Sequence, residues 1–146
     1  MLPRAHVVIR ALRREDEPVL FALAEQSFGE SLPSDDTVAV LTRCLVFVAE
    51  ADDGEIAGYV ALLEEGPDLC IRQLLVSPMK DEDDRHVGDQ LCDWVEGYGI
   101  NHGFERVRID LGDDEERARH FYARRGYRPA RIGGLERELP RLAGGD

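Results

Sequence analysis

Cysteines, histidines and serines are among the side chains that could act as nucleophiles, and cysteines and histidines can also hold a metal ion. The three cysteines, Cys44, Cys70 and Cys92, lie among apolar neighbours and include no C-x-x-C pair, so we expect buried thiols rather than disulfides or metal ligands. The four histidines are scattered, and none has the spacing of a metal site. The chain has no G-x-S-x-G motif and no recognisable Cys–His pair, so covalent catalysis has little support.

A proton donor is a better supported candidate, and it is Tyr122 in the segment ERARHFYARRGY. A phenol keeps its proton at neutral pH, which a general acid requires. Tyr122 shares a helical face with Ala118, Phe121 and Arg125. A tyrosine on such a face can equally be a core residue whose hydroxyl is hydrogen-bonded. The spacing leaves both interpretations open.

Tyr122 belongs to a stretch from Leu69 to Tyr127 whose patterns predict a strand, an acidic loop, a helix, a strand and a helix. Apolar residues occupy both sides of the first strand, which is typical of a strand covered on both faces. In the second strand, Val107 and Ile109 alternate with arginines, as in a strand with one polar face. Because a helix lies between the strands, we expect parallel neighbours joined by a right-handed crossover.

The remaining elements follow from alternation, helical spacing and turn residues. We expect strands at 7–12, 127–132 and 135–139, helices at 14–28 and 34–41, and a hairpin of strands at 45–50 and 55–63. No linker or repeat divides the 146 residues, so they are expected to form one domain. The predicted order β-α-α-β-β-β-α-β-α-β-β places the chain in the α/β (α+β) class.

The chain resembles the GCN5-related N-acetyltransferase (GNAT) family. The resemblance rests on LLVSP closing a strand, on a glycine-containing loop that opens a helix, and on a segment similar to the family's N-x-x-A-x-x-F-Y-x-x-x-G-[FY] signature. The residues that match the signature are Ala118, Phe121, Tyr122, Gly126 and Tyr127, with Glu115 in place of the asparagine. The order of elements is also that of the family. The resemblance therefore implies a single GNAT-like domain over 1–146, with a mixed sheet and helices on both faces.

What the resemblance implies is an N-acetyltransferase that moves an acetyl group from acetyl-CoA to a primary amine of a small molecule or peptide by direct attack. Exposed backbone groups of Leu74, Leu75 and Val76 would pair with the pantetheine arm and polarise the thioester carbonyl. The pyrophosphate would lie where the next helix begins, because unpaired N–H groups and the helix dipole favour an anion there. The residues implied at that position are Arg85, His86, Val87, Gly88, Asp89 and Gln90. Tyr122 matches the tyrosine that can protonate the departing thiolate.

The helix-opening loop departs from the usual family pattern, [RQ]-x-x-G-x-[GA]. Either Arg85 takes the first position or Gly88 takes the last small one, and we prefer the second because the helix's apolar residues then match those of the family. Asp83 then replaces the usual Arg or Gln. The segment MKDEDDRHVGDQ carries five acids against Lys80 and Arg85, so an anion would depend on backbone donors with the acids in solvent. The alternative is a solvated acidic turn on a non-catalytic GNAT-fold domain that serves in binding or regulation.

Two further groups of side chains have roles that the sequence leaves open. An amine must lose a proton before it attacks a thioester, and the polar side chains that could face a cleft are Glu50, Glu64, Glu65, Gln73 and Asp110. Arginines cluster on and after the last helix, at Arg119, Arg124, Arg125 and Arg128. They could pair with the cofactor's adenosine phosphate, or they could neutralise nearby acids and the helix C-terminus.

Charge and hydropathy limit the classes of partner. Thirty acidic and eighteen basic side chains give a net charge of −12, which argues against nucleic acid and could favour a cationic substrate. No apolar run approaches the roughly 20 residues that span a bilayer, and no signal peptide opens the chain, so we expect a cytoplasmic protein without membrane contact. The family resemblance also allows a homodimer.

Overall fold

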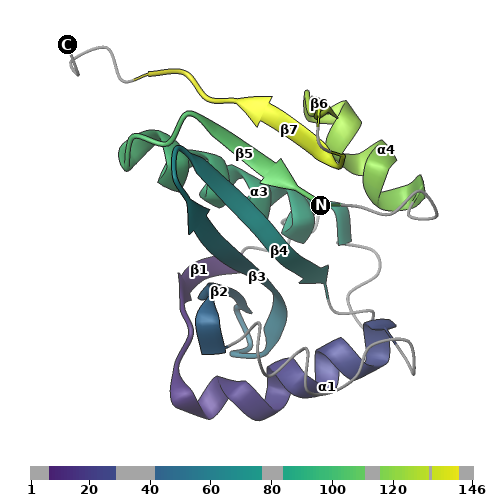
Figure 1. Ribbon diagram of the computed structural model, residues 1–146. Helices are drawn as coiled ribbons and strands as arrows, with labels where there is room; N and C mark the ends of the chain where they lie inside the picture. The colour runs from purple at the N-terminus through teal and green to yellow at the C-terminus, as the bar shows by residue number, and fades with distance from the viewer. Residues whose placement is uncertain (1–6, 29–41, 77–83, 111–115, 132, 142–146) are drawn as a thin grey trace, which may run out of the picture. The chain divides into compact units, whose positions relative to one another are not determined.

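The computed structural model of the chain describes residues 7–28, 42–76, 84–110, 116–131 and 133–141 (Figure 1). Within these residues, seven strands hydrogen-bond in the order β1-β2-β3-β4-β5-β7-β6. The strands are β1 (Val7–Ala11), β2 (Leu45–Ala51), β3 (Ile56–Glu65), β4 (Asp68–Val76), β5 (Arg106–Ile109), β6 (Arg128–Pro129) and β7 (Leu135–Glu138). The helices are α1 (Glu17–Phe28), which follows a 3-10 turn at Arg14–Asp16, α3 (Asp84–Asn101) and α4 (Glu116–Arg124). The helix expected at 34–41 lies outside the described residues.

Strand pairing confirms the predicted α/β class. β4 and β5 are parallel, with Asp68–Ile71 opposite Arg106–Ile109, and α3 connects them in the chain. The pairs β1–β2, β2–β3, β5–β7 and β6–β7 are antiparallel. The predicted hairpin is formed by β2 and β3, and its turn includes Gly54 at a φ of 86°, which a glycine adopts without a steric cost. Together these pairs make the mixed sheet that the family resemblance implied.

β6 is shorter than the strand predicted at 127–132. Only Arg128 and Pro129 belong to it. Pro129 has no N–H to extend the ladder, and the N–H of Ala130 instead donates to the carbonyl oxygen of Gly134 at 3.0 Å. The chain therefore leaves the strand early and enters the predicted glycine turn.

Contacts define two compact units that share three elements. The first unit comprises Met1–Leu62 and Gln73–Trp94, and the second comprises Leu63–Arg72 and Val95–Asp146. The division falls within β3, β4 and α3, each of which passes from one unit into the other. It therefore lies inside regular elements and not in a linker.

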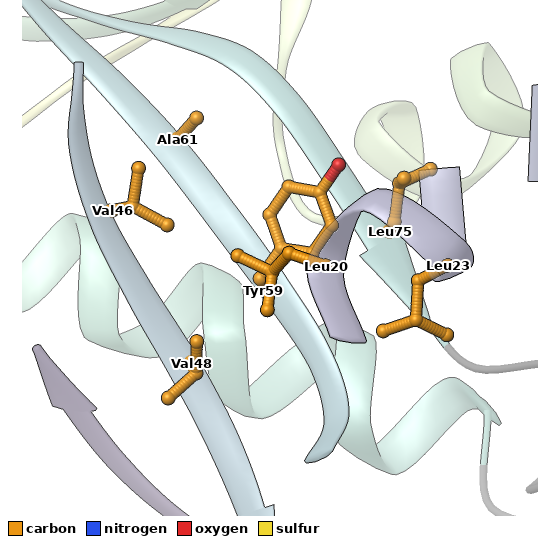
Figure 2. Close-up of a cluster of buried hydrophobic side chains, with 7 residues drawn as sticks. All are labelled: Leu20, Leu23, Val46, Val48, Tyr59, Ala61 and Leu75. Atoms are coloured by element: carbon orange, nitrogen blue, oxygen red, sulfur yellow. The ribbon is translucent and has the colours of Figure 1, made fainter. Parts of the chain in front are cut away.

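The core of the first unit contains one helix face and three strands (Figure 2). Its buried residues are Leu20 and Leu23 from α1, Val46 and Val48 from β2, Tyr59 and Ala61 from β3, and Leu75 from β4. Spacings of three on the helix and two on the strands put each pair on one face of its element. Full burial of an aliphatic side chain stabilises the fold by about 1.5–3 kcal/mol. The side chain of Leu75 is thus committed to the core, which anchors the end of β4.

An ion pair fixes the start of α1 to β1 and β2. The Arg10 guanidinium donates to both carboxylate oxygens of Asp16, at 2.8 and 3.1 Å, and to Glu50 at 3.0 Å. Asp16 also accepts a hydrogen bond from the N–H of Arg13 at 2.8 Å. The bond from Arg10, followed by that from Arg13, holds the pKa of Asp16 below its usual value although burial opposes this.

β5, in the second unit, has the single polar face that its alternation predicted. Val107 and Ile109 are buried, whereas Arg106 and Arg108 are half-buried. Both arginines lie near Asp68 on β4, with nitrogen–oxygen distances of 3.3 and 3.6 Å. Because Asp68 is only 8% exposed, two cations beside it offset the cost of burying its carboxylate.

Candidate active site

The predicted pantetheine-binding residues, Leu74, Leu75 and Val76, form the last part of β4. β5 ends at Ile109, which pairs with Ile71, while β4 continues to Val76. In the described part of the chain, β5 therefore offers no pairing partner beyond Ile71. Leu75 is buried, and Leu74 and Val76 are half-buried. The result is a strand end whose backbone could receive an extended ligand in the manner of an added strand.

α3 begins at Asp84, earlier than the glycine-containing loop was expected to end. The predicted anion-binding residues, Arg85–Gln90, consequently lie within its first two turns. The N–H groups of the first three helical residues lack a partner inside an α-helix, so among the described residues the available donors belong to 84–86 and not to 87–90. The early start has a physical reason, because Val87 is 1% exposed and falls on the same buried helix face as Leu91.

The first turns of α3 carry both buried and half-buried residues. Val87 and Gly88 are buried, whereas Asp89 and Gln90 are half-buried. Lys80 and the acids at 81–83 lie outside the described residues. The described residues thus supply a helix start for the predicted anion site without locating the acidic segment before it.

Tyr122 lies on α4 and is 3% exposed, as a residue on the buried helix face should be. Its ring packs edge-on against those of Phe121 and Tyr127, with centroid distances of 5.0 and 5.2 Å. Two aromatic contacts restrict the tilt of the phenol, and each contributes about 0.5–1.5 kcal/mol. The orientation of Tyr122 is therefore set by its aromatic neighbours.

The F-Y-x-x-x-G-Y spacing also explains how α4 ends. The N–H of Tyr127 donates to the carbonyl oxygen of Tyr122 at 3.0 Å, and the N–H of Gly126 donates to that of Ala123 at 3.0 Å. These two bonds form a Schellman motif, which needs a residue in the left-handed region. Gly126 supplies it at a φ of 96°. The glycine thus turns the chain so that the ring of Tyr127 meets that of Tyr122.

Sequence patterns did not single out Glu96 on α3, yet its carboxylate joins three elements of the second unit. Oε1 accepts hydrogen bonds from Arg125 at 3.1 Å and from Arg137 at 3.0 Å, and Oε2 accepts one from the hydroxyl of Tyr127 at 3.0 Å. The side chain of Glu96 is 12% exposed, so the arginines neutralise a carboxylate that is largely removed from water. Of the clustered arginines, Arg125 therefore has a charge-neutralising role.

A sequence signal for Glu96 did exist. It lies four residues after Cys92 and three before Gly99, both of which are buried, so it falls on the apolar face of α3. A carboxylate on such a face requires partners from other elements. Nothing in the periodicity identifies those partners, because they come from the turn after α4 and from β7.

The polar side chains considered as bases all have partners in the structure. The pairs are Glu50 with Arg10 at 2.8 Å, Gln73 with the Tyr59 hydroxyl at 2.7 Å, Glu64 with the Tyr98 hydroxyl at 3.1 Å, Glu65 with Arg72 at 3.0 Å, and Asp110 with Arg72 at 3.7 Å. Burial raises the pKa of the Tyr59 phenol, and burial and the Glu64 carboxylate raise that of Tyr98. No member of the set stands apart as a proton acceptor.

The expectation of buried thiols holds for two of the three cysteines. Cys70 and Cys92 are buried, and Cys44 is half-buried. Burial raises the pKa of Cys70 to about 11, so this thiol stays protonated at neutral pH. In the residues that the structure describes, no three His, Cys, Asp or Glu side chains gather as metal ligands would. None of the helices described is both long and apolar enough to cross a membrane.

Comparison with known proteins identifies the family. Residues 9–127 match the sequence model of the acetyltransferase (GNAT) family. A GNAT-family acetyltransferase from Staphylococcus aureus Mu50 is similar in structure, with a TM-score of 0.74 and 16% identity over 92% of this chain and 99% of its own. No curated protein is significantly similar in sequence.

Two other structural neighbours were solved with the cofactor. The GNAT-family N-acetyltransferase YhbS from Escherichia coli, in complex with CoA, has a TM-score of 0.72 and 21% identity over 96% of this chain and 85% of its own. The PaiA N-acetyltransferase from Thermoplasma acidophilum, in complex with coenzyme A, has a TM-score of 0.75 and 16% identity over 91% and 99%. These likenesses support the fold, and the match over residues 9–127 shows that the protein belongs to the acetyltransferase (GNAT) family of enzymes.

Proposed function

We propose that the protein transfers the acetyl group of acetyl-CoA to a primary amine of a small molecule or peptide. The observation that carries this proposal is the end of β4, which continues past β5 and is followed in the chain by the start of α3. A strand end suits the amide-containing pantetheine arm, and a helix start suits the pyrophosphate. Both features lie in the first unit. Two structural neighbours bound to CoA support the same ligand class.

The residues have distinct roles in this proposal. Backbone groups of Leu74, Leu75 and Val76 pair with the pantetheine arm and polarise the thioester carbonyl. N–H groups in the predicted segment Arg85–Gln90, of which those at 85 and 86 are not used within the helix, hold the pyrophosphate. Because these donors are main-chain atoms, the unusual side chains of the segment do not prevent binding.

The proposed reaction proceeds without a covalent enzyme intermediate. The amine nitrogen attacks the thioester carbon and forms the C–N bond, the C–S bond breaks, and the amine proton passes to a water or carboxylate base. Tyr122 donates its phenolic proton to the departing CoA thiolate and recovers one from solvent. Direct attack is consistent with Cys70, whose raised pKa leaves it without thiolate at neutral pH.

A cationic acceptor is favoured by the charge of the protein. The net charge of −12 raises the local concentration of cations, and amines are protonated in solution. Small polyamines and peptides with free amino groups both meet this description. The charge does not distinguish between them, so both belong in the first screen.

Turnover with a panel of amines tests the proposal. Purified protein is mixed with acetyl-CoA and each amine, and both CoA and the acetylated amine are measured by mass spectrometry. We expect matched amounts of the two products with at least one cationic amine, and only slow CoA release without amine. Binding of acetyl-CoA without transfer to any amine would contradict the proposed reaction and leave a binding or regulatory role.

A further inference from the structure

Gly58 on β3 lies at a junction of three segments of the first unit. A Cβ atom placed on Gly58 would lie 2.5 Å from the carbonyl oxygen of Leu75, 3.3 Å from Cα of Val76 and 3.3 Å from Cγ1 of Val87. The first two atoms belong to the backbone of β4, which cannot rotate aside as a long side chain can. Only a glycine therefore allows β3, the end of β4 and the first turns of α3 to approach so closely.

β3 is irregular next to this junction. In its ladder with β2, Gly58 pairs with Ala49 and Ile56 pairs with Glu50, which leaves Ala57 as an extra residue. An extra residue bends a strand and increases its local twist, and such bulges are frequent next to functional sites. Ala57 is 1% exposed, so the bend is packed into the unit. The bulge and the glycine thus act at the same place on β3.

We propose that Gly58 is a positioning residue for CoA binding. Its missing side chain lets the Leu75–Val76 backbone and the start of α3 lie at the spacing that the pantetheine arm and the pyrophosphate of one ligand require. The inference rests on the proposed function, because it uses the ligand assigned there. It goes beyond that function by assigning a role to a residue on β3 that acts only through Leu75, Val76 and Val87.

The contact distances set the size of the expected effect. In Gly58→Ala, the carbonyl oxygen of Leu75 must move by at least about 0.5 Å to reach the 3.0 Å below which Cβ atoms essentially never make contacts. Good N–H···O hydrogen bonds span only about 2.7–3.2 Å, so a displacement of that size takes a bond of the usual length, about 2.9 Å, out of this range. A lost hydrogen bond that leaves a buried polar group unpaired weakens binding by about ten- to hundredfold. We therefore expect the Kd for CoA to rise about ten- to hundredfold.

Isothermal titration calorimetry with CoA tests this inference on the full chain. The matched control is Gly97→Ala, because Gly97 lies on α3 and a Cβ there would have no neighbour within 4 Å. We expect the control to bind CoA as the wild type does and Gly58→Ala to bind at least tenfold more weakly while remaining folded by circular dichroism. In turnover, KM for acetyl-CoA should rise, whereas KM for the amine should change less than twofold. A purely structural defect would not divide the constants in this way.

Three results would overturn the inference, and they are distinguishable. If Gly58→Ala is folded and its Kd for CoA lies within twofold of wild type, the positioning role is wrong while the proposed function stands. If wild type itself does not bind CoA, the proposed function fails and the inference fails with it. If Gly58→Ala does not fold, Val87→Ile, which enlarges the helix side of the same junction, takes its place. Unchanged CoA affinity in folded Val87→Ile would then reject the role, and a tenfold loss would support it.

Discussion

Replacing Glu96 would measure how strongly burial controls the strength of an ion pair. One carboxylate oxygen, Oε1, accepts hydrogen bonds from Arg125 at 3.1 Å and from Arg137 at 3.0 Å. The two pairs have nearly the same length, but the side chain of Arg125 is 14% exposed and that of Arg137 is 40% exposed. Solvent should therefore screen the second pair much more than the first.

The expected magnitudes follow from these exposures. Glu96→Ala removes three hydrogen bonds and the carboxylate that neutralises the largely buried Arg125 guanidinium, which should lower the free energy of unfolding by about 3–5 kcal/mol. For a protein of this size, that corresponds to a fall in Tm of about 10 °C. In double-mutant cycles, the Glu96–Arg125 coupling should be about 1.5–3 kcal/mol and the Glu96–Arg137 coupling at most about 1 kcal/mol.

Urea unfolding of six proteins measures the stability change and the two coupling energies. They are the wild type, the alanine variants of Glu96, Arg125 and Arg137, and the two double variants that contain Glu96→Ala. Equal slopes of free energy against urea would show that the variants unfold between similar states. Equal coupling energies for the two arginines would refute the claim that burial sets their strength. A loss of less than about 1 kcal/mol in the free energy of unfolding for Glu96→Ala would refute the claim that the hydrogen bonds to Glu96 stabilise the second unit.

Three further predictions concern single side chains. The pKa of Asp16 in the folded protein lies below the ordinary value of 3.8. The Asp16 carboxylate therefore stabilises the fold above pH 3.8, and this stabilisation is lost as the pH falls through the folded pKa. Urea unfolding should show Asp16→Asn to be less stable than wild type at neutral pH, with a difference that shrinks in acid. Tyr59→Phe should lower the free energy of unfolding by about 1–3 kcal/mol, because it leaves the buried amide oxygen of Gln73 without the Tyr59 hydroxyl, and urea unfolding that changed by less would contradict this. Tyr122→Phe keeps the ring contacts and should lower kcat about a hundredfold without changing the Kd for CoA; an unchanged kcat would reject Tyr122 as the general acid.

Local signals carried most of the fold prediction. The hairpin of β2 and β3 follows from alternation on both sides of a turn that ends in Gly54, and the parallel pairing of β4 and β5 follows from the helix between them. The end of α4 can also be predicted from the sequence, since Gly126 supplies the left-handed residue that the Schellman motif needs. In each case, residues close in sequence determine the structure.

Features that depend on contacts between distant segments could not be predicted in the same way. The start of α3 at Asp84 depends on Val87 being buried, whereas the glycine and the acids of that segment suggested a loop. The partners of Glu96 come from the turn after α4 and from β7, and no periodicity links these segments to α3. The roles of Tyr122 and of Arg85–Gln90 remain predictions, because they concern a ligand and not the packing of the chain.

The different burial of the three thiols allows one cysteine to be labelled selectively with a fluorophore. At neutral pH, a thiol with a pKa of about 11 is a thiolate in roughly one molecule in ten thousand, so Cys70 should resist alkylation in the folded state. Cys92 is 0% exposed, which shields it from reagents of any size. Cys44 is half-buried and precedes β2, and so it is the natural attachment point for a single fluorophore. A label there would report on the first unit without the need to remove either buried cysteine.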